Sequence, residues 1–243
     1  MTQLSHELLL PMDISSLSEG GLFEGSNILL NGPPGVGKTI FCENFIRSYL
    51  QEGMSCIYVT LEKTPQEITQ HFQSTGVDLS SDRYREKMTF VDGYTWLIGE
   101  SSERFHIESL SNLTELNFKI FSASMKLKRP ILLVFNSISP LTLYNPETFV
   151  SKSLQLLFAR IKEMGGLGLF TIQTGVHDSR FYNTLEYLVD GIFDMKFGEY
   201  KGSIKRYFRI RSLRSARHKT DWVPFTIEPE REIKLDTRGE EKE

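Results

Sequence analysis

The chain has 243 residues, of which 24% are charged and 40% hydrophobic, and its formal net charge is −3. This size and composition are typical of a soluble domain with a sizeable core, and no apolar run approaches the roughly 18 residues of a membrane span. The start lacks a basic segment before Leu8-Leu9-Leu10, which argues against a secretory signal. Cys42 and Cys56 have no metal-binding or redox spacing. We therefore expect reduced structural thiols and a cytoplasmic protein.

The most informative stretch follows the first predicted core strand, after a short lead-in over residues 1–24. The apolar run 27–30 predicts a buried parallel strand, and a helical pattern covers 39–51. Between them lies a complete phosphate-binding loop of the Walker A pattern G-x-x-x-x-G-K-[ST], made of Gly32, Pro33, Pro34, Gly35, Val36, Gly37, Lys38 and Thr39. Its backbone N–H groups and the following helix start favour phosphate, while Lys38 is expected to reach the β- and γ-phosphates and Thr39 to ligate Mg²⁺. The loop predicts binding of a purine nucleoside triphosphate.

Strands and helices alternate along the rest of the chain, which predicts a mostly parallel central sheet flanked by helices. Further strands are expected at 56–61, 88–91, 131–135 and 167–172, and further helices at about 64–74, 111–127 and 147–164. The alternation of strands and helices stops near the C-terminus. There, two strand-like runs at 192–199 and 204–213 flank Tyr200-Lys201-Gly202-Ser203, which predicts a β-hairpin. Short strands at 223–227 and 232–235 follow. With no break in composition, we expect one domain over 1–243, with a core at about 12–235 and a charged tail at 236–243.

Hydrolysis of a nucleotide needs a base or a water-orienting group near the γ-phosphate. Glu62 directly follows a predicted parallel strand, and ligand sites open at the carboxyl ends of such strands. It is the candidate catalytic base, alongside Lys38. The alternative for Glu62 is an exposed carboxylate that caps the helix beginning near Thr64-Pro65.

Three other features have plain alternatives. The segment 196–219 holds nine Lys or Arg and one acid, Glu199, so it is either a phosphate-binding surface for nucleotide or DNA or a solvated edge strand. Tyr94 and Trp96 either stack on a base or pack on the surface, and we favour packing. His177 and Asp178 fall in a predicted loop, and no metal-binding pattern supports them as ligands.

Several segments, in order, resemble the RecA superfamily and within it the KaiC-like ATPases, over about residues 12–235. Besides the phosphate loop, they are 20–25, 58–62, 188–192, 213–218 and 223–227. AAA+ ATPases share the loop pattern but continue into a helical lid and carry a paired acidic motif, which this chain lacks. The resemblance implies a RecA-like α/β fold, ATP and Mg²⁺ as ligands, and a ring-like homo-oligomer of the hexamer type.

The resemblance also makes the departures informative. Where the family has an acid after the strand 131–135, this chain has Asn136, which is expected in the second shell of Mg²⁺ and to bind it less well than a carboxylate. Lys63 replaces the second acid that many members place beside Glu62. Of a Lys-x-Arg pair that contacts the neighbour's nucleotide, Ser212 and Arg214 remain. Gln173 corresponds to a polar γ-phosphate sensor.

We therefore expect an ATP-binding protein that is a weak or degenerate Mg²⁺-dependent ATPase and acts as a nucleotide-dependent regulatory or assembly module with a protein partner. The alternative is an active DNA-dependent ATPase that assists recombination, like the RadA-type recombinase paralogues, and the basic segment 196–219 favours it. Neither reading predicts association with a membrane.

Overall fold

The computed structural model describes residues 7–8, 12–100, 105–214 and 216–236. The expected charged tail lies outside the described residues from residue 237 onward, as does most of the apolar start before Met12. Among the helices of the described part, none combines the length and the apolar character that crossing a membrane requires.

A nine-stranded sheet forms the centre of the molecule, in the order β11-β10-β9-β8-β3-β7-β6-β4-β5. The strands from β8 to β5 are mutually parallel, whereas β9, β10 and β11 extend the sheet in antiparallel fashion. Their bounds are β3 (Asn27–Gly32), β4 (Ser55–Thr60), β5 (Met88–Asp92), β6 (Ile131–Asn136), β7 (Leu167–Gln173), β8 (Gly191–Tyr200), β9 (Ser203–Leu213), β10 (Val223–Ile227) and β11 (Ile233–Leu235). A separate small sheet pairs β1 (Glu7–Leu8) with β2 (Leu22–Phe23).

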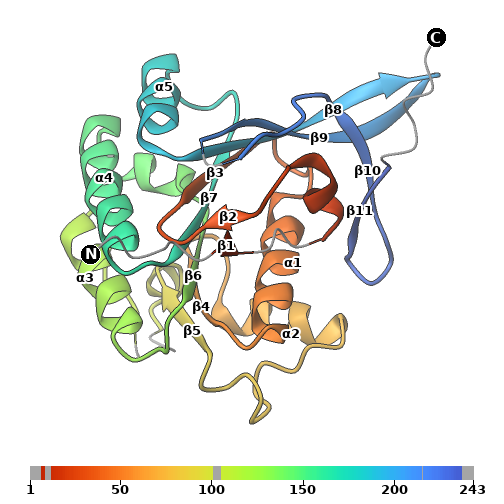
Figure 1. The fold of residues 1–243 in the computed structure, drawn as a ribbon. Helices are drawn as coiled ribbons and strands as arrows, with labels where there is room; N and C mark the ends of the chain where they lie inside the picture. The colour runs from red at the N-terminus through yellow and green to blue at the C-terminus, as the bar shows by residue number, and fades with distance from the viewer. Residues whose placement is uncertain (1–6, 9–11, 101–104, 215, 237–243) are drawn as a thin grey trace, which may run out of the picture.

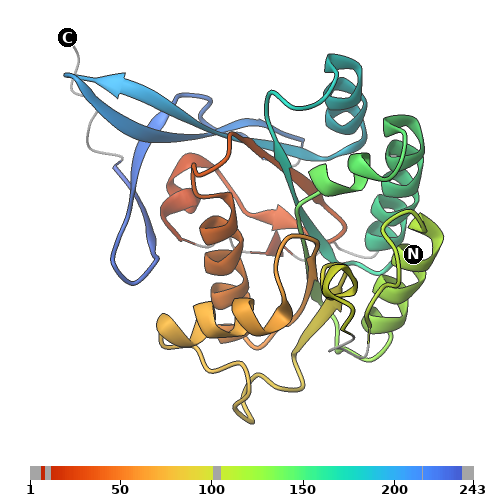
Figure 2. The same ribbon diagram turned by 180° about the vertical axis from the view of Figure 1, so that it is seen from behind.

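Helices cover both faces of this sheet, as Figures 1 and 2 show from opposite sides. One face carries α1 (Lys38–Gln51) and α2 (Pro65–Ser74), and the other carries α3 (Leu113–Ser124), α4 (Glu147–Glu163) and α5 (Ser179–Leu188). Three short 3₁₀ helices, η1 (Met12–Leu17), η2 (Thr95–Ile98) and η3 (Ser139–Leu143), lie in the connections. Strand β3 shows why both faces are covered, because Ile28 and Leu30 pack in the core under α1 while Leu29 packs in the core under α4.

The α/β fold with its mostly parallel sheet and C-terminal hairpin confirms the sequence prediction. Helix α3 is shorter than the expected 111–127, since Asn112 caps its start by accepting from the N–H of Glu115 and the chain turns after Ser124. The sequence did not predict α5. That helix buries Phe181 and Leu185, one turn apart, and so short an apolar stripe does not stand out beside polar neighbours.

The hairpin β8–β9 extends beyond the body of the molecule (Figure 1). Tyr200 pairs with Ser203, and the two residues between them, Lys201 and Gly202, both have positive φ angles of 51° and 75°. Two such residues make the tight turn whose twist matches that of the strands. The glycine in the sequence is the signal that made this turn predictable.

Candidate nucleotide-binding site

The phosphate loop connects the buried strand β3 to the start of α1. Gly37, the residue that precedes α1, has φ 118°, a conformation that other residues rarely adopt. A Cβ atom at this position would also lie 3.1 Å from Cδ1 of Ile227 on β10. At Gly35, by contrast, a Cβ would meet nothing within 4 Å, so the outer side of the loop is open to a ligand. The C-terminal strand β10 thus supports the loop at Gly37, whereas the side of the loop at Gly35 makes no such contact.

Lys38 lies folded back on this loop. Its Nζ donates to the carbonyl oxygens of Gly32 at 2.6 Å and Pro33 at 2.9 Å, and the residue is 8% exposed. Burial lowers the pKa of Lys38 to about 8, partly offset by the nearby carboxylate of Glu62. The ammonium group is therefore positioned inside the loop but poorly solvated, which favours exchange of its carbonyl partners for phosphate oxygens.

A cavity of about 300 Å³ opens above the carboxyl ends of the parallel strands. The sheet order explains its composition, because β3, β7, β6 and β4 are consecutive neighbours and each ends at this edge. Most of the side chains that the sequence places at the site meet here. The lining residues are Pro34, Gly35, Gly37, Lys38, Thr39, Ile40, Glu62, Lys63, Asn136, Ser137, Gln173 and Arg231.

Asn136, the last residue of β6, uses its whole amide group in hydrogen bonds. Its Nδ2 donates to Oγ1 of Thr39 at 3.1 Å and to the hydroxyl of Tyr58 at 2.9 Å, while its Oδ1 accepts from Oγ1 of Thr171 at 2.8 Å. Burial raises the pKa of the Tyr58 hydroxyl, which stays neutral. The amide thus holds the loop threonine directly. Tyr58 and Thr171 were not predicted as part of the site, although both lie on predicted core strands where a polar side chain needs a partner.

Glu62 is exposed and faces the cavity from the end of β4. Its Oε1 lies 3.5 Å from Oγ of Ser137 and 3.5 Å from Nε2 of Gln173, both long contacts that leave the carboxylate available. The alternative role as a helix cap does not hold. Helix α2 is capped instead by Thr64, whose side chain and N–H form a reciprocal pair with Glu67.

Arg231 is a site residue that the sequence analysis missed. It lies in the turn between β10 and β11 with φ 58°, and its Nε and Nη2 donate to Oε2 of Glu43 at 3.1 and 2.9 Å. Glu43, on α1, is 2% exposed, and its other oxygen lies 3.3 Å from Nδ1 of His71 on α2. An acid within the buried part of α1 is the signal that could have indicated a cation brought from elsewhere in the chain.

Arg214 does not line this cavity. Its N–H donates to the carbonyl of Asp190, whose own N–H donates to Asn27 at the beginning of β3. The phosphate loop begins at the other end of β3, five residues or about 17 Å away. The guanidinium of Arg214 donates at 2.9 Å to the carbonyl of Tyr187 near the end of α5. Within one chain, Arg214 therefore serves the opposite edge of the sheet.

The remaining residues that the sequence analysis singled out are held by packing and hydrogen bonds within the protein. The indole N–H of Trp96 donates to Gly93, and its ring contacts Tyr144 edge-on at 5.7 Å, in keeping with the packing role favoured for it. His177 lies 2.9 Å from Oγ of Ser139 and 3.3 Å from Glu147, and burial lowers its pKa. Cys42 and Cys56 are buried free thiols whose pKa burial raises. The described residues contain no group of three His, Cys, Asp or Glu side chains suited to a metal ion.

Comparison with known proteins decides the family of this fold. The family model of the KaiC ATPase matches residues 12–240. The chain belongs to the KaiC ATPase family. A UPF0273 protein of Thermotoga maritima is 29% identical over 220 residues, which cover 88% of this chain and 89% of that protein. A UPF0273 protein of Methanopyrus kandleri is 29% identical over 219 residues, covering 87% and 84%.

A solved structure supports the same family at the level of the fold. The crystal structure of a KaiC-like protein of Pyrococcus horikoshii superposes with a TM-score of 0.77 at 25% sequence identity. The match covers 95% of this chain and 99% of that protein. The expected RecA-like fold and KaiC-like membership are therefore confirmed.

Proposed function

We propose that this KaiC-family chain acts as one ATP-binding domain whose phosphate loop holds the triphosphate while hydrolysis is slow. The hydrogen bond from Asn136 to Thr39 is the observation that carries this proposal. Three features support phosphate binding: the open side of the loop at Gly35, the buried Lys38 and the start of α1. Lys38 and Thr39 would contact phosphate oxygens, and Glu62 would orient water.

Mg²⁺ fits this donor set as an ion that takes most of its ligands from phosphates and water. When bound, it would neutralise charge on the phosphate oxygens. On the protein side, the hydroxyl of Thr39 is the first candidate ligand, and Asn136 stands behind it. Because an amide N–H occupies one lone pair of that hydroxyl, the oxygen is a poorer ligand than one that donates its proton to a carboxylate. A lower Mg²⁺ affinity and slow turnover follow from this arrangement.

The other departures support the same reading. Lys63 lines the cavity beside Glu62 and puts a cation where the resemblance implies a second acid. If nucleotide binding is retained and hydrolysis is slow, the nucleotide-bound form of the protein is long-lived, and a protein partner can recognise that form. We therefore propose a nucleotide-dependent regulatory or assembly module.

The test measures ATP affinity beside ATP turnover. Wild type should bind ATP with Mg²⁺, and Lys38→Ala should bind about tenfold more weakly or worse, because the cation inside the loop is lost. Turnover should be slow and should not rise with single-stranded DNA. Equal affinity of both proteins would contradict the phosphate-loop assignment, and fast DNA-stimulated turnover would contradict the regulatory module.

One observation favours the alternative of a nucleic-acid-dependent ATPase. One face of the β8–β9 hairpin alternates cations with aromatic rings: Nζ of Lys196 lies 4.1 Å from the ring centre of Trp222, and Nζ of Lys205 lies 4.5 Å from that of Tyr200. Tyr207 covers Gly198 on the same face. Tyr200 is exposed, and Tyr207 and Trp222 are half-buried. Cations beside such rings suit single strands, whose phosphates bind cations and whose bases stack on rings.

The arginines that the basic segment 196–219 suggests for DNA differ in their availability. Arg209 and Arg211 are paired with Asp194, and Arg211 also with Glu186, so their charges are already compensated. Arg206 lies on the opposite face, with its guanidinium over Phe197 at 5.6 Å. If DNA binds, Lys196→Ala with Lys205→Ala should lower the salt dependence by about 0.7 per lost phosphate contact, whereas Arg206→Ala should not. Absence of binding at low salt by fluorescence anisotropy would remove this alternative.

We also propose that Arg214 acts between subunits of a ring-like homo-oligomer. Its position at the edge opposite its own loop supports a contact made in a second copy, since within one chain it lies too far from the phosphates. Ser212, two residues earlier on β9, offers no second cation.

A further inference from the structure

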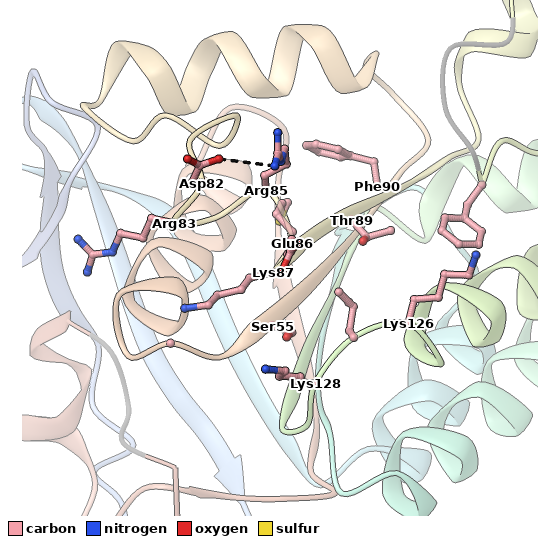
Figure 3. A pocket seen from close by; sticks show the side chains of 14 residues that line it. Ser55, Asp82, Arg83, Arg85, Glu86, Lys87, Thr89, Phe90, Lys126 and Lys128 are labelled. Atoms are coloured by element: carbon pink, nitrogen blue, oxygen red, sulfur yellow. Dashed lines mark ion pairs between the residues drawn. The ribbon is translucent and has the colours of Figure 1, made fainter.

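A second polar cavity lies at the end of the sheet opposite the phosphate loop. Its volume is about 500 Å³, and it lies at the amino ends of β4 and β5, beside the segment that leads into β6 (Figure 3). Strand β4 alone has six residues, so this cavity and the phosphate loop are separated by about 17 Å or more. The two cavities share no lining residue. A ligand here would be independent of one bound at the loop.

Backbone pairing brings two lysines to the same place. The N–H of Cys56 donates to the carbonyl of Lys87 at 2.7 Å, and the N–H of Ser55 donates to Pro130 at 3.4 Å. Lys87 therefore lies on one side of the first residue of β4, and Lys128, two residues before Pro130, lies on the other, as Figure 3 shows around Ser55. Nζ of Lys87 is held near the turn at Gly53, 3.8 Å from the position that a Cβ would take there.

The charges of the lining are unbalanced. It contains the cations Arg83, Arg85, Lys87, Lys126 and Lys128 and the acids Asp82 and Glu86, so five positive charges face two negative ones in a chain whose net charge is −3. Asp82 pairs with Arg85 at 3.5 Å. Across the residues that the structure describes, Lys87 and Lys128 have no acidic partner within salt-bridge distance. A concave site in which cations outnumber acids raises the local concentration of anions.

Aromatic rings form the rest of the wall. Phe90, on the edge strand β5, is half-buried and lines the cavity, and Nζ of Lys126 lies 5.5 Å from the ring centre of Phe105. A compact anion such as phosphate would contact the lysines, while a group attached to it would reach the rings. The volume lies within the range of small-molecule sites.

We propose that this cavity, the amino-edge pocket, binds a phosphate-bearing ligand through Lys87 and Lys128. The shared chemistry is a phosphate group with at least two negative charges. It has two sources, a free nucleotide or polyphosphate and the backbone of a nucleic-acid strand. Lys126 and the two phenylalanines contact what the phosphate carries.

The experiment uses the full chain carrying Lys38→Ala, so that the phosphate loop does not compete for the probes. Inorganic pyrophosphate, ADP and a short oligothymidylate are titrated by calorimetry. The test variant adds Lys87→Gln and Lys128→Gln. The matched control adds Lys119→Gln and Lys234→Gln, which change the net charge equally at one half-buried and one exposed lysine outside the pocket.

We expect pyrophosphate to bind with a stoichiometry of about one and to lose about tenfold in affinity in the test variant but not in the control. If the oligothymidylate alone binds and loses affinity in the same way, the source is a nucleic acid; if ADP or pyrophosphate binds, it is a free phosphate compound. Absence of binding by all three probes overturns the proposal, as does equal weakening in both variants.

A second measurement keeps Lys87 and Lys128 in place, so that misfolding of a variant at these positions cannot explain its result. The probe that binds in the titrations should slow acetylation of Lys87 and Lys128 relative to Lys119 and Lys234, as read by mass spectrometry. Equal labelling rates with and without that probe overturn the proposal. ATP binding to the wild-type phosphate loop is measured separately, so either site can fail without the other.

Discussion

Replacement of Asn136 by aspartate tests the reasoning about slow turnover, because it changes one amide into a carboxylate at nearly constant size. Three hydroxyl groups surround the side chain: Thr39 at 3.1 Å, Tyr58 at 2.9 Å and Thr171 at 2.8 Å. In the wild type, two of these accept hydrogen bonds from the amide. In Asn136→Asp all three can rotate to donate, and Thr39 then keeps both lone pairs for other partners.

The magnitude follows from the hydrogen bonds that change. A hydrogen bond to a charged group contributes about 1.5–3 kcal/mol, compared with about 1 kcal/mol for a neutral one. A net gain of about 1.4 kcal/mol in holding Thr39 and the metal shell corresponds to about tenfold in Mg²⁺ affinity. Asn136 is 7% exposed, so a carboxylate placed there carries a desolvation cost without Mg²⁺, and the free variant should be less stable than wild type by about 1–3 kcal/mol.

The assay follows ATP turnover as a function of Mg²⁺ concentration, together with thermal unfolding with and without Mg²⁺ and ATP. We expect the half-saturating Mg²⁺ concentration to fall about tenfold, turnover to rise, and Mg²⁺–ATP to stabilise the variant more than the wild type. Asn136→Ala is the control, since it frees Thr39 without adding charge. If Asn136→Asp folds and binds ATP but shows unchanged Mg²⁺ dependence and level turnover, the explanation from Asn136 is refuted.

Three further outcomes follow from the site. Burial lowers the pKa of Lys38 to about 8, and bound phosphate favours the charged form of this side chain, so ATP affinity should be constant below pH 8 and fall above it. At about pH 8.5 the protein should therefore take up protons when it binds ATP, as measured by calorimetry in two buffers. This uptake should vanish in Lys38→Arg, whose side chain stays charged. Arg231→Ala should lower the free energy of unfolding by about 1–3 kcal/mol, and Glu43→Gln added to it should restore part of the loss in a denaturant titration. ATP should promote self-association detected by light scattering, and Arg214→Ala should abolish it; a monomer under every condition would contradict the contact between subunits.

The arrangement of the carboxyl edge was predictable from the sequence because it follows from topology. Once the strands before Gly32, Glu62, Asn136 and Gln173 are known to be parallel, their ends must meet at one edge. The partners of Asn136 were not predictable. Tyr58 lies on β4 and Thr171 on β7, and the register of each of these strands against β6 depends on packing across the whole sheet.

Arg231 and α5 show a second kind of difficulty. The pairing of Arg231 with Glu43 joins two segments through the fold of everything between them, and no local pattern encodes it. Helix α5 presents too few apolar residues for its period to be recognised, although Asp178 precedes it as a typical residue for a helix start. Arg214 directly follows β9, the last long strand, and its distance from its own loop emerges from the direction of β9 relative to β3.

The contact between Arg231 and Glu43 also has a consequence for biosynthesis. The two residues are 188 positions apart, and the loop glycine Gly37 rests against Ile227, which is made almost as late. During synthesis, the phosphate loop is therefore made long before the segments that support it. Until then Glu43 has no guanidinium and Gly37 no apolar backing. The full support of the phosphate loop can therefore form only after β10 and the turn that follows it have been synthesised, and we expect tight nucleotide binding only after that point.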